Sequence, residues 1–149
     1  MVPEATAETL FFAGVRCMAA ADDAGAEAHF RAALLRNPHF PEALTNFALL
    51  RERAGAVAEA EQAYRQAIAL DPACLQNHLN LGVLLLNGKR FDEAESVHLD
   101  ALRRAPASPV AWSNYGVLLA CLKREAEAEH CYRTALGLDS GYAKASFNL

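Results

Sequence analysis

The sequence predicts an all-α fold built from stacked helical hairpins, and three observations indicate it. Apolar residues recur at spacings of three and four, as on one face of a helix. Prolines that would end a helix, Pro38, Pro72 and Pro106, return every 34 residues. Small and aromatic side chains return at the same interval. A fixed repeat of this length indicates hairpins that each need a neighbour to bury their apolar faces.

The unit is clearest over residues 75–108, where two apolar stripes are separated by Asn87, Gly88 and Lys89. We expect the Asn87–Gly88 pair to end the first helix in a left-handed conformation, and Pro106 to end the second helix. The first stripe consists of Leu75, His78, Leu81, Gly82 and Leu85, and the second of Ala94, Val97, His98, Ala101, Leu102 and Ala105.

Four columns of equivalent residues extend this unit along the chain. The small residues predict positions where two helices cross closely, because a larger side chain would push them apart. The small columns are Gly14, Ala48, Gly82 and Gly116; Ala26, Ala60, Ala94 and Ala128; and Ala33, Ala67, Ala101 and Ala135. The mostly aromatic column is Phe30, Tyr64, His98 and Tyr132.

Taken in order, the hairpins are expected at about residues 7–40, 41–74, 75–108 and 109–142, within one domain of residues 1–149. Pro41 suits a first helical position, and Ser108 is a plausible N-cap before Pro109. The pattern restarts as a partial fifth helix over residues 143–149. Because no polar capping helix follows, we expect a fragment of a longer repeat protein or an open end that packs on another copy.

These columns resemble the tetratricopeptide repeat, a family with a period of 34 residues. The resemblance covers about residues 7–149 and implies a right-handed α-solenoid, or superhelix. His78 and Leu44 stand where the family usually has Trp, which loosens individual units without removing the period. The fourth unit carries the signature best, with Trp112, Tyr115, Gly116, Ala128, Tyr132 and Ala135.

A polar column in the first helices is the candidate binding feature. Asparagine is a poor residue inside a helix, yet Asn46, Asn80, Asn114 and Asn148 recur in register. In the family these helices line a concave groove, and the column resembles the asparagine ladder of protein O-linked N-acetylglucosamine transferases. Each amide offers a donor and an acceptor for a peptide backbone. The alternative is an inherited residue that bonds locally or to water.

The same register assigns further residues to the groove. An alternative interpretation is that some of the aliphatic side chains of this strip pack between helices and do not face the groove. Arg53 is the only base of this strip before Lys144, which disfavours a phosphate site or a clamp for acidic peptide ends. The predicted groove residues besides the asparagines are Thr45, Leu49, Arg53, Leu79, Val83, Leu86, Asn87, Ser113 and Val117.

Composition narrows the function class. The net charge of −4, with interspersed signs, disfavours nucleic acid and anionic membranes as partners. His78 and His98 fall in one hairpin without a third ligand, so we expect a hydrogen-bonded or half-exposed pair and no metal site. No catalytic or cofactor motif is found. Six second-helix carboxylates are expected to be solvated charges: Glu59, Glu61, Glu93, Glu95, Glu127 and Glu129. Four cysteines without CxxC spacing suggest free thiols and a cytoplasmic location, and the alternative is a mature periplasmic form whose signal has been removed.

The sequence therefore predicts a protein–protein interaction module without enzymatic activity, which binds a partner protein or peptide in the groove. Two alternatives stay open. In the first, the chain is the substrate-recruiting arm of a larger enzyme such as a glycosyltransferase. In the second, it is a scaffold that forms homo-oligomers through its uncapped C-terminal end.

Overall fold

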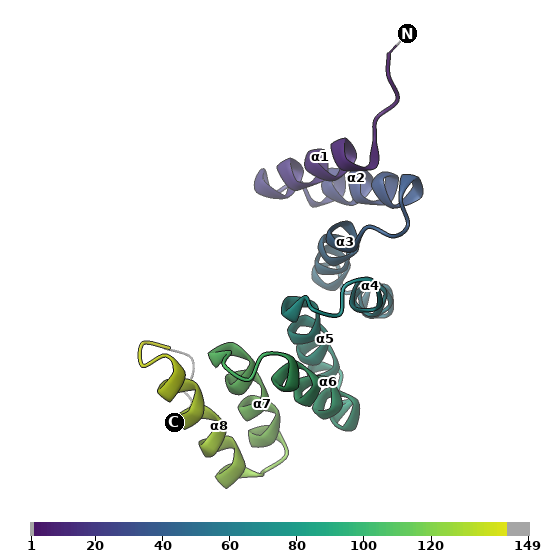
Figure 1. Cartoon of the computed structure of the whole chain (residues 1–149). Helices are drawn as coiled ribbons and strands as arrows, with labels where there is room; N and C mark the ends of the chain where they lie inside the picture. Colours follow the sequence, from purple (N-terminus) through teal and green to yellow (C-terminus); the bar gives the residue numbers. More distant parts are fainter. Residues whose placement is uncertain (1, 143–149) are drawn as a thin grey trace. The chain divides into compact units, whose positions relative to one another are not determined.

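The computed structural model describes residues 2–142, and within them the chain is helical with short connections (Figure 1). The all-α prediction is confirmed, and the succession of helical hairpins is that of a helical solenoid. The predicted fifth helix over residues 143–149, with Asn148 and Lys144, lies outside the described residues. The helices are α1 (Ala7–Ala19), α2 (Asp23–Arg36), α3 (Pro41–Arg53), α4 (Val57–Leu70), α5 (Leu75–Asn87), α6 (Phe91–Arg104), α7 (Pro109–Cys121) and α8 (Glu125–Leu138).

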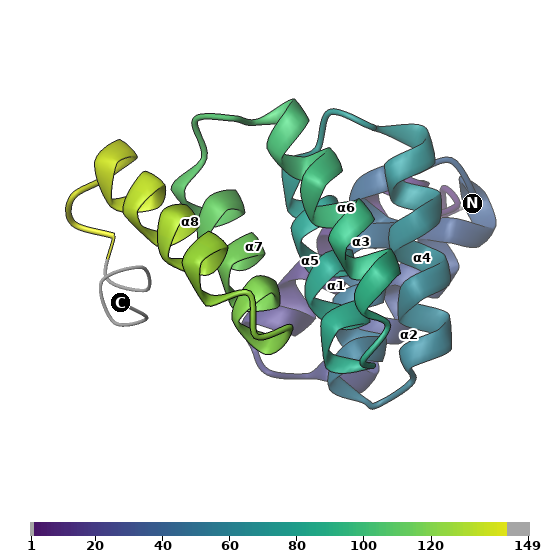
Figure 2. The same cartoon turned by 90° about the horizontal axis from the view of Figure 1, so that it is seen from below.

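The chain divides into two compact units, Met1–Pro72 and Ala73–Leu149. In the first unit, α1 packs on α2 and α3 on α4, while α2 joins the two hairpins by its contact with α3. The second unit repeats this plan: α5 packs on α6, α7 on α8, and α6 contacts α7. In addition, α5 lies beside α7, so that two first helices of the second unit are neighbours (Figure 2).

The hairpin turns share one backbone conformation. A residue with positive φ follows each first helix at the same repeat position: Ala21, Gly55, Lys89 and Lys123. The next backbone N–H then donates to a carbonyl five residues earlier, as in Arg90 to Leu85, which satisfies a helix-end acceptor. α5 ends at Asn87, as expected, but the left-handed conformation expected of Asn87–Gly88 was wrong. Lys89 adopts the left-handed conformation instead, because the repeat fixes this position whatever residue occupies it.

Helix starts follow the sequence signals where polar caps exist. The Ser108 hydroxyl accepts a hydrogen bond from the Ala111 N–H at 3.2 Å, which confirms the predicted N-cap. Pro41 and Pro109 stand at the beginning of α3 and α7, where a missing N–H costs no hydrogen bond. α3 and α7 therefore begin at positions that the sequence defines.

The glycine column is explained by aromatic rings. A Cβ added to Gly116 would lie 2.6 Å from the Tyr132 ring, and one added to Gly82 would lie 2.6 Å from the His98 ring. Gly14 has the same relation to Phe30. We expected these glycines to allow close crossing of the helices themselves. What they accommodate is a ring from the second helix, which occupies the place of the missing side chain at these three crossings.

Candidate protein-interaction surface

The predicted groove residues lie on the first helices and are called here the asparagine face. In the first unit they belong to α3, and in the second unit to the neighbouring helices α5 and α7. The asparagine face of the first unit consists of Thr45, Asn46, Leu49 and Arg53, and that of the second unit of Leu79, Asn80, Val83, Leu86, Asn87, Ser113, Asn114 and Val117.

On α3, the side chain of Asn46 is half-buried and forms no hydrogen bond within residues 2–142. Thr45 donates from its hydroxyl to the Pro41 carbonyl at 3.0 Å, a bond inside its own helix. Arg53 is exposed and forms an ion pair with Asp23 at 3.0 Å. The amide of Asn46 is therefore the member of this group with its full hydrogen-bonding capacity available to a partner.

On α5, Asn80 accepts a hydrogen bond at Oδ1 from Gln76 Nε2 at 2.7 Å. Its Nδ2 atom has no hydrogen-bond partner in the described part of the chain. A carboxamide donor without a protein partner is costly unless water or a ligand accepts from it. The Nδ2 donor of Asn80 is thus buried and unpaired among the described residues, whereas the half-buried Asn46 has both its donor and its acceptor unused.

Other members of the asparagine face are buried. Leu79 is 5% exposed and packs with Ala101, Leu102 and Ala111. Ser113 is fully buried, and Asn114 is 6% exposed. These three side chains contribute to packing inside the second unit, as the alternative interpretation of the strip allowed for its aliphatic members. Val83, Leu86 and Val117 are half-buried and Asn87 is exposed, so they remain accessible.

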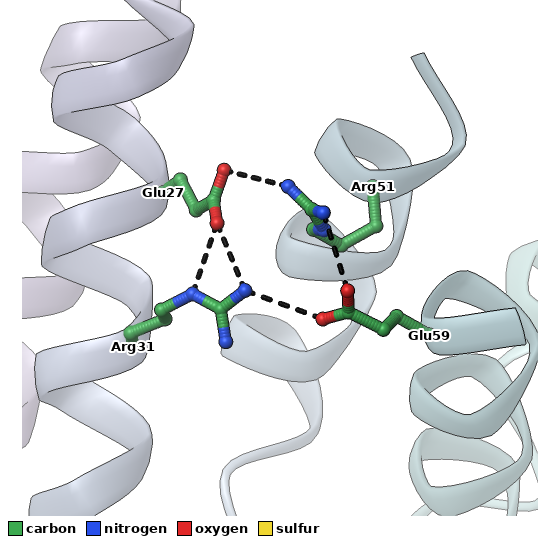
Figure 3. Close-up of polar contacts among 4 residues, drawn as sticks. All are labelled: Glu27, Arg31, Arg51 and Glu59. Atoms are coloured by element: carbon green, nitrogen blue, oxygen red, sulfur yellow. Dashed lines mark hydrogen bonds and ion pairs between the residues drawn. The ribbon is translucent and has the colours of Figure 1, made fainter. Parts of the chain in front are cut away.

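A network of four charged side chains joins three helices of the first unit (Figure 3). Glu27 on α2 accepts from Arg31 at 2.9 Å and from Arg51 on α3 at 2.8 Å. Glu59 on α4 accepts from Arg31 and from Arg51, each at 3.2 Å. Burial by itself would raise the pKa of Glu27, but the hydrogen bond from Arg31 and the charges of Arg51 and Arg31 lower it overall.

This network was missed because Glu59 was assigned to solvated helix charges. Glu59 is exposed, as that assignment says, although it is also paired with two arginines. The assignment was wrong for Glu95, which is half-buried and whose carboxylate accepts from Tyr115 at 2.9 Å and from Arg124 at 2.8 Å. Arg51 is the residue from which the network could have been predicted, because the third and fourth repeats have leucine at the same position. A charge in an apolar column indicates a partner on the neighbouring helix.

Polar groups of the second unit form a corresponding cluster around Tyr115. Burial, followed by the hydrogen bond to Glu95, raises the pKa of the Tyr115 hydroxyl to about 12. Arg124 also binds Glu127 at 2.6 Å, so Glu95 and Glu127 share one guanidinium. Both units therefore join a second helix to the following hairpin by carboxylate contacts.

The two histidines of the third hairpin are both buried, so of the two alternatives expected for them the half-exposed pair was wrong. The His98 ring lies against Gly82, and His78 Nδ1 lies 3.6 Å from Asp100 Oδ2. Burial would raise the pKa of Asp100, but hydrogen bonding and charge from Arg104, with smaller contributions from His78 and Arg103, lower it overall. Among residues 2–142, no three His, Cys, Asp or Glu side chains are grouped to hold a metal ion.

Solved structures with the same fold are found, although no curated protein sequence gives a significant match. MamA residues 41 to the end from Desulfovibrio magneticus RS-1 is 19% identical, with a TM-score of 0.82 over 93% of this chain and 78% of that chain. The pilF structure from Pseudomonas aeruginosa is 21% identical, with a TM-score of 0.81 over 94% of this chain and 64% of that chain. These two likenesses concern the fold alone.

A third similar structure is TTC0263, a thermophilic tetratricopeptide protein of Thermus thermophilus. It is 27% identical, with a TM-score of 0.73 over 91% of this chain and 75% of that chain. In the part of the chain that the structure describes, no helix has the length and apolar character needed to cross a membrane. The family model of the tetratricopeptide repeat matches residues 18–73, 46–109 and 79–143. The chain therefore belongs to the tetratricopeptide repeat family.

Proposed function

We propose that this protein is a binding module in which the asparagine face of each unit holds an extended segment of a partner protein. The observation that carries the proposal is the hydrogen-bonding capacity left on Asn46 and Asn80. A carboxamide pairs with a peptide N–H or C=O whatever side chain the peptide carries. Half-buried Leu49, Val83 and Val117 supply apolar contact beside these amides.

The role is one of recognition without chemistry, and this fits a family whose repeats present surfaces for other proteins. In this proposal Asn114 orders the packing of α7, since it is nearly buried, and Asn46 and Asn80 make the ligand contacts. The free thiols of Cys17, Cys74, Cys121 and Cys131 support a reducing, cytoplasmic location.

The test begins with a displayed library of random 12-residue peptides selected on the wild-type protein. We expect the double variant Asn46→Ala and Asn80→Ala to bind the selected peptides about tenfold more weakly, because each lost hydrogen bond contributes about 0.5–1.5 kcal/mol. Calorimetric titration of single synthetic peptides measures the change.

The matched control is Gln66→Ala, which removes an exposed amide from the second helix α4. This control is expected to bind like the wild type. Equal affinity of the asparagine double variant and the wild type would contradict the proposal, provided that circular dichroism shows both to be folded.

A further inference from the structure

The second unit has an open pocket between α6 and α7, away from the asparagine face. Its volume is about 520 Å³. Apolar and aromatic side chains from the two helices form most of its wall. The lining residues are Ser96, Leu99, Leu102, Arg103, Trp112 and Tyr115.

The first unit has a pocket at the equivalent place, two repeats earlier, with a volume of about 330 Å³. Four of its lining residues match the lining of the second pocket in repeat register. The pairs are Arg31 with Leu99, Leu34 with Leu102, Leu44 with Trp112, and Phe47 with Tyr115.

In the first unit the chain itself supplies an arginine at this place. The Arg31 guanidinium lies 4.7 Å from the centre of the Phe47 ring, a cation–π arrangement. It also bonds to Glu27 at 2.9 Å and to Glu59 at 3.2 Å (Figure 3). Phe47 is consequently buried. This site therefore shows how a guanidinium fits between an aromatic ring and carboxylates in this repeat.

In the second unit the arginine is missing, but the aromatic ring and the carboxylate at the equivalent positions are present. Leu99 occupies the position of Arg31 and is 41% exposed, and the Tyr115 ring is only half-buried. Glu95, which corresponds to Glu27, uses Oε1 for Tyr115 and Arg124. Its Oε2 has no partner within residues 2–142, although Glu27 uses both oxygens.

The charge balance agrees with this difference. In the first unit two arginines face Glu27 and Glu59, whereas among the described residues of the second unit Arg124 is the one cation paired with Glu95 and Glu127. On the other rim of the pocket, Arg103 is paired with Asp100 at 3.0 Å, which offsets its charge. A cationic group is therefore the charge that the Tyr115 side of the pocket lacks.

We propose that this pocket binds an arginine side chain presented by a partner protein. The guanidinium stacks on Tyr115 and bonds to Glu95 Oε2, and its aliphatic stem lies against Leu99 and Trp112. The partner's arginine thus makes the same kinds of contact, with an aromatic ring and a carboxylate, that Arg31 makes within the first unit. It uses a surface separate from the asparagine face, so it stands or falls independently of the function proposed above.

The chain contains one tryptophan, so fluorescence reports on the pocket directly through Trp112. The probes are three blocked pentapeptides, Gly-Ala-X-Ala-Gly, in which X is arginine, its neutral isostere citrulline, or leucine. We expect a saturable change with the arginine peptide at millimolar concentration and at least fivefold weaker binding of the other two. A guanidinium on an exposed ring beside one carboxylate supports an affinity of this order.

Two variants locate the binding. Leu99→Arg rebuilds the arrangement of the first unit and is expected to abolish the fluorescence change, because the chain then fills its own pocket. Glu95→Gln keeps an acceptor for Tyr115 and is expected to weaken arginine binding at least threefold. The matched control is Leu138→Arg, at a second-helix leucine that is 44% exposed, and it is expected to leave binding unchanged.

Three results would overturn the proposal. Equal or tighter binding of the leucine peptide would show an apolar pocket without preference for charge. Equal binding of the citrulline peptide would show that the positive charge is not recognised. No saturable change with any peptide up to about 10 mM, a range that covers ordinary weak ligands, would show that the pocket does not bind side chains of this size.

Discussion

Replacing Phe30 by alanine is expected to lower the free energy of unfolding of the first unit by about 3–5 kcal/mol. Phe30 is fully buried, and its ring fills the space that Gly14 leaves open on α1. Removing the ring leaves a cavity that neither helix is able to close, because glycine has no side chain to move into it. Denaturant unfolding followed by circular dichroism measures the change.

The control for this prediction is Phe12→Ala in the same hairpin. Phe12 is 58% exposed, and its ring makes an edge contact with the Phe11 ring. The control is expected to change the free energy of unfolding by less than about 0.5 kcal/mol. Similar losses for the two alanine variants would contradict the packing described for Gly14 and Phe30.

Replacing Gly116 by valine is expected to destabilise the second unit by about 1–3 kcal/mol. The new Cβ would lie 2.6 Å from a ring carbon of Tyr132, so either the ring or the whole of α8 has to shift. The tyrosine ring is buried against the same helix pair and has little free space. Thermal and denaturant unfolding both report the loss.

The same substitution at Gly137 separates the steric effect from helix propensity. Gly137 lies in α8 with no atom within 4 Å of an added Cβ. Valine is a better helix residue than glycine, so Gly137→Val is expected to be neutral or slightly stabilising. If Gly116→Val proved as stable as Gly137→Val, the ring would not be what requires glycine at this position.

The repeat made most of the fold predictable. The helical hairpins could be predicted from the repeat register, because an atypical residue in one unit is outweighed by the equivalent residues of the other three units. Local signals were less secure. At residues 87–89 the glycine suggested a left-handed Gly88, yet the structure has this conformation at Lys89. Comparing the turns of all four hairpins would have located it, since Gly55 occupies the same repeat position.

The site was less predictable than the fold. Register identifies which residues share a face, but the exposure of each one depends on side chains from the neighbouring helices. Leu79 and Val83 belong to the same predicted strip, and only Leu79 is buried. Ion pairs such as Arg51 with Glu27 join residues of different helices, so no spacing within one helix reveals them.

The pockets show how a repeat protein diversifies. Arg31 and Leu99 are equivalent positions, and the pocket lined by Arg31, of about 330 Å³, is smaller than the one lined by Leu99, of about 520 Å³. The framework around them, with Glu27 and Glu95 on the second helices, is retained. A repeat fold thus keeps its packing columns and varies the residues between them, where partners are distinguished.

The most direct test of the account follows the side-chain amide signals of Asn46 and Asn80 by NMR during titration with a selected peptide. The account predicts that both pairs of Nδ2–H resonances shift in proportion to the bound fraction, because these amides contact the peptide backbone. The amides of Gln62 and Gln66 on α4 are expected to stay in place. Saturated binding with the two asparagine signals unmoved would contradict the assignment of this face as the binding surface.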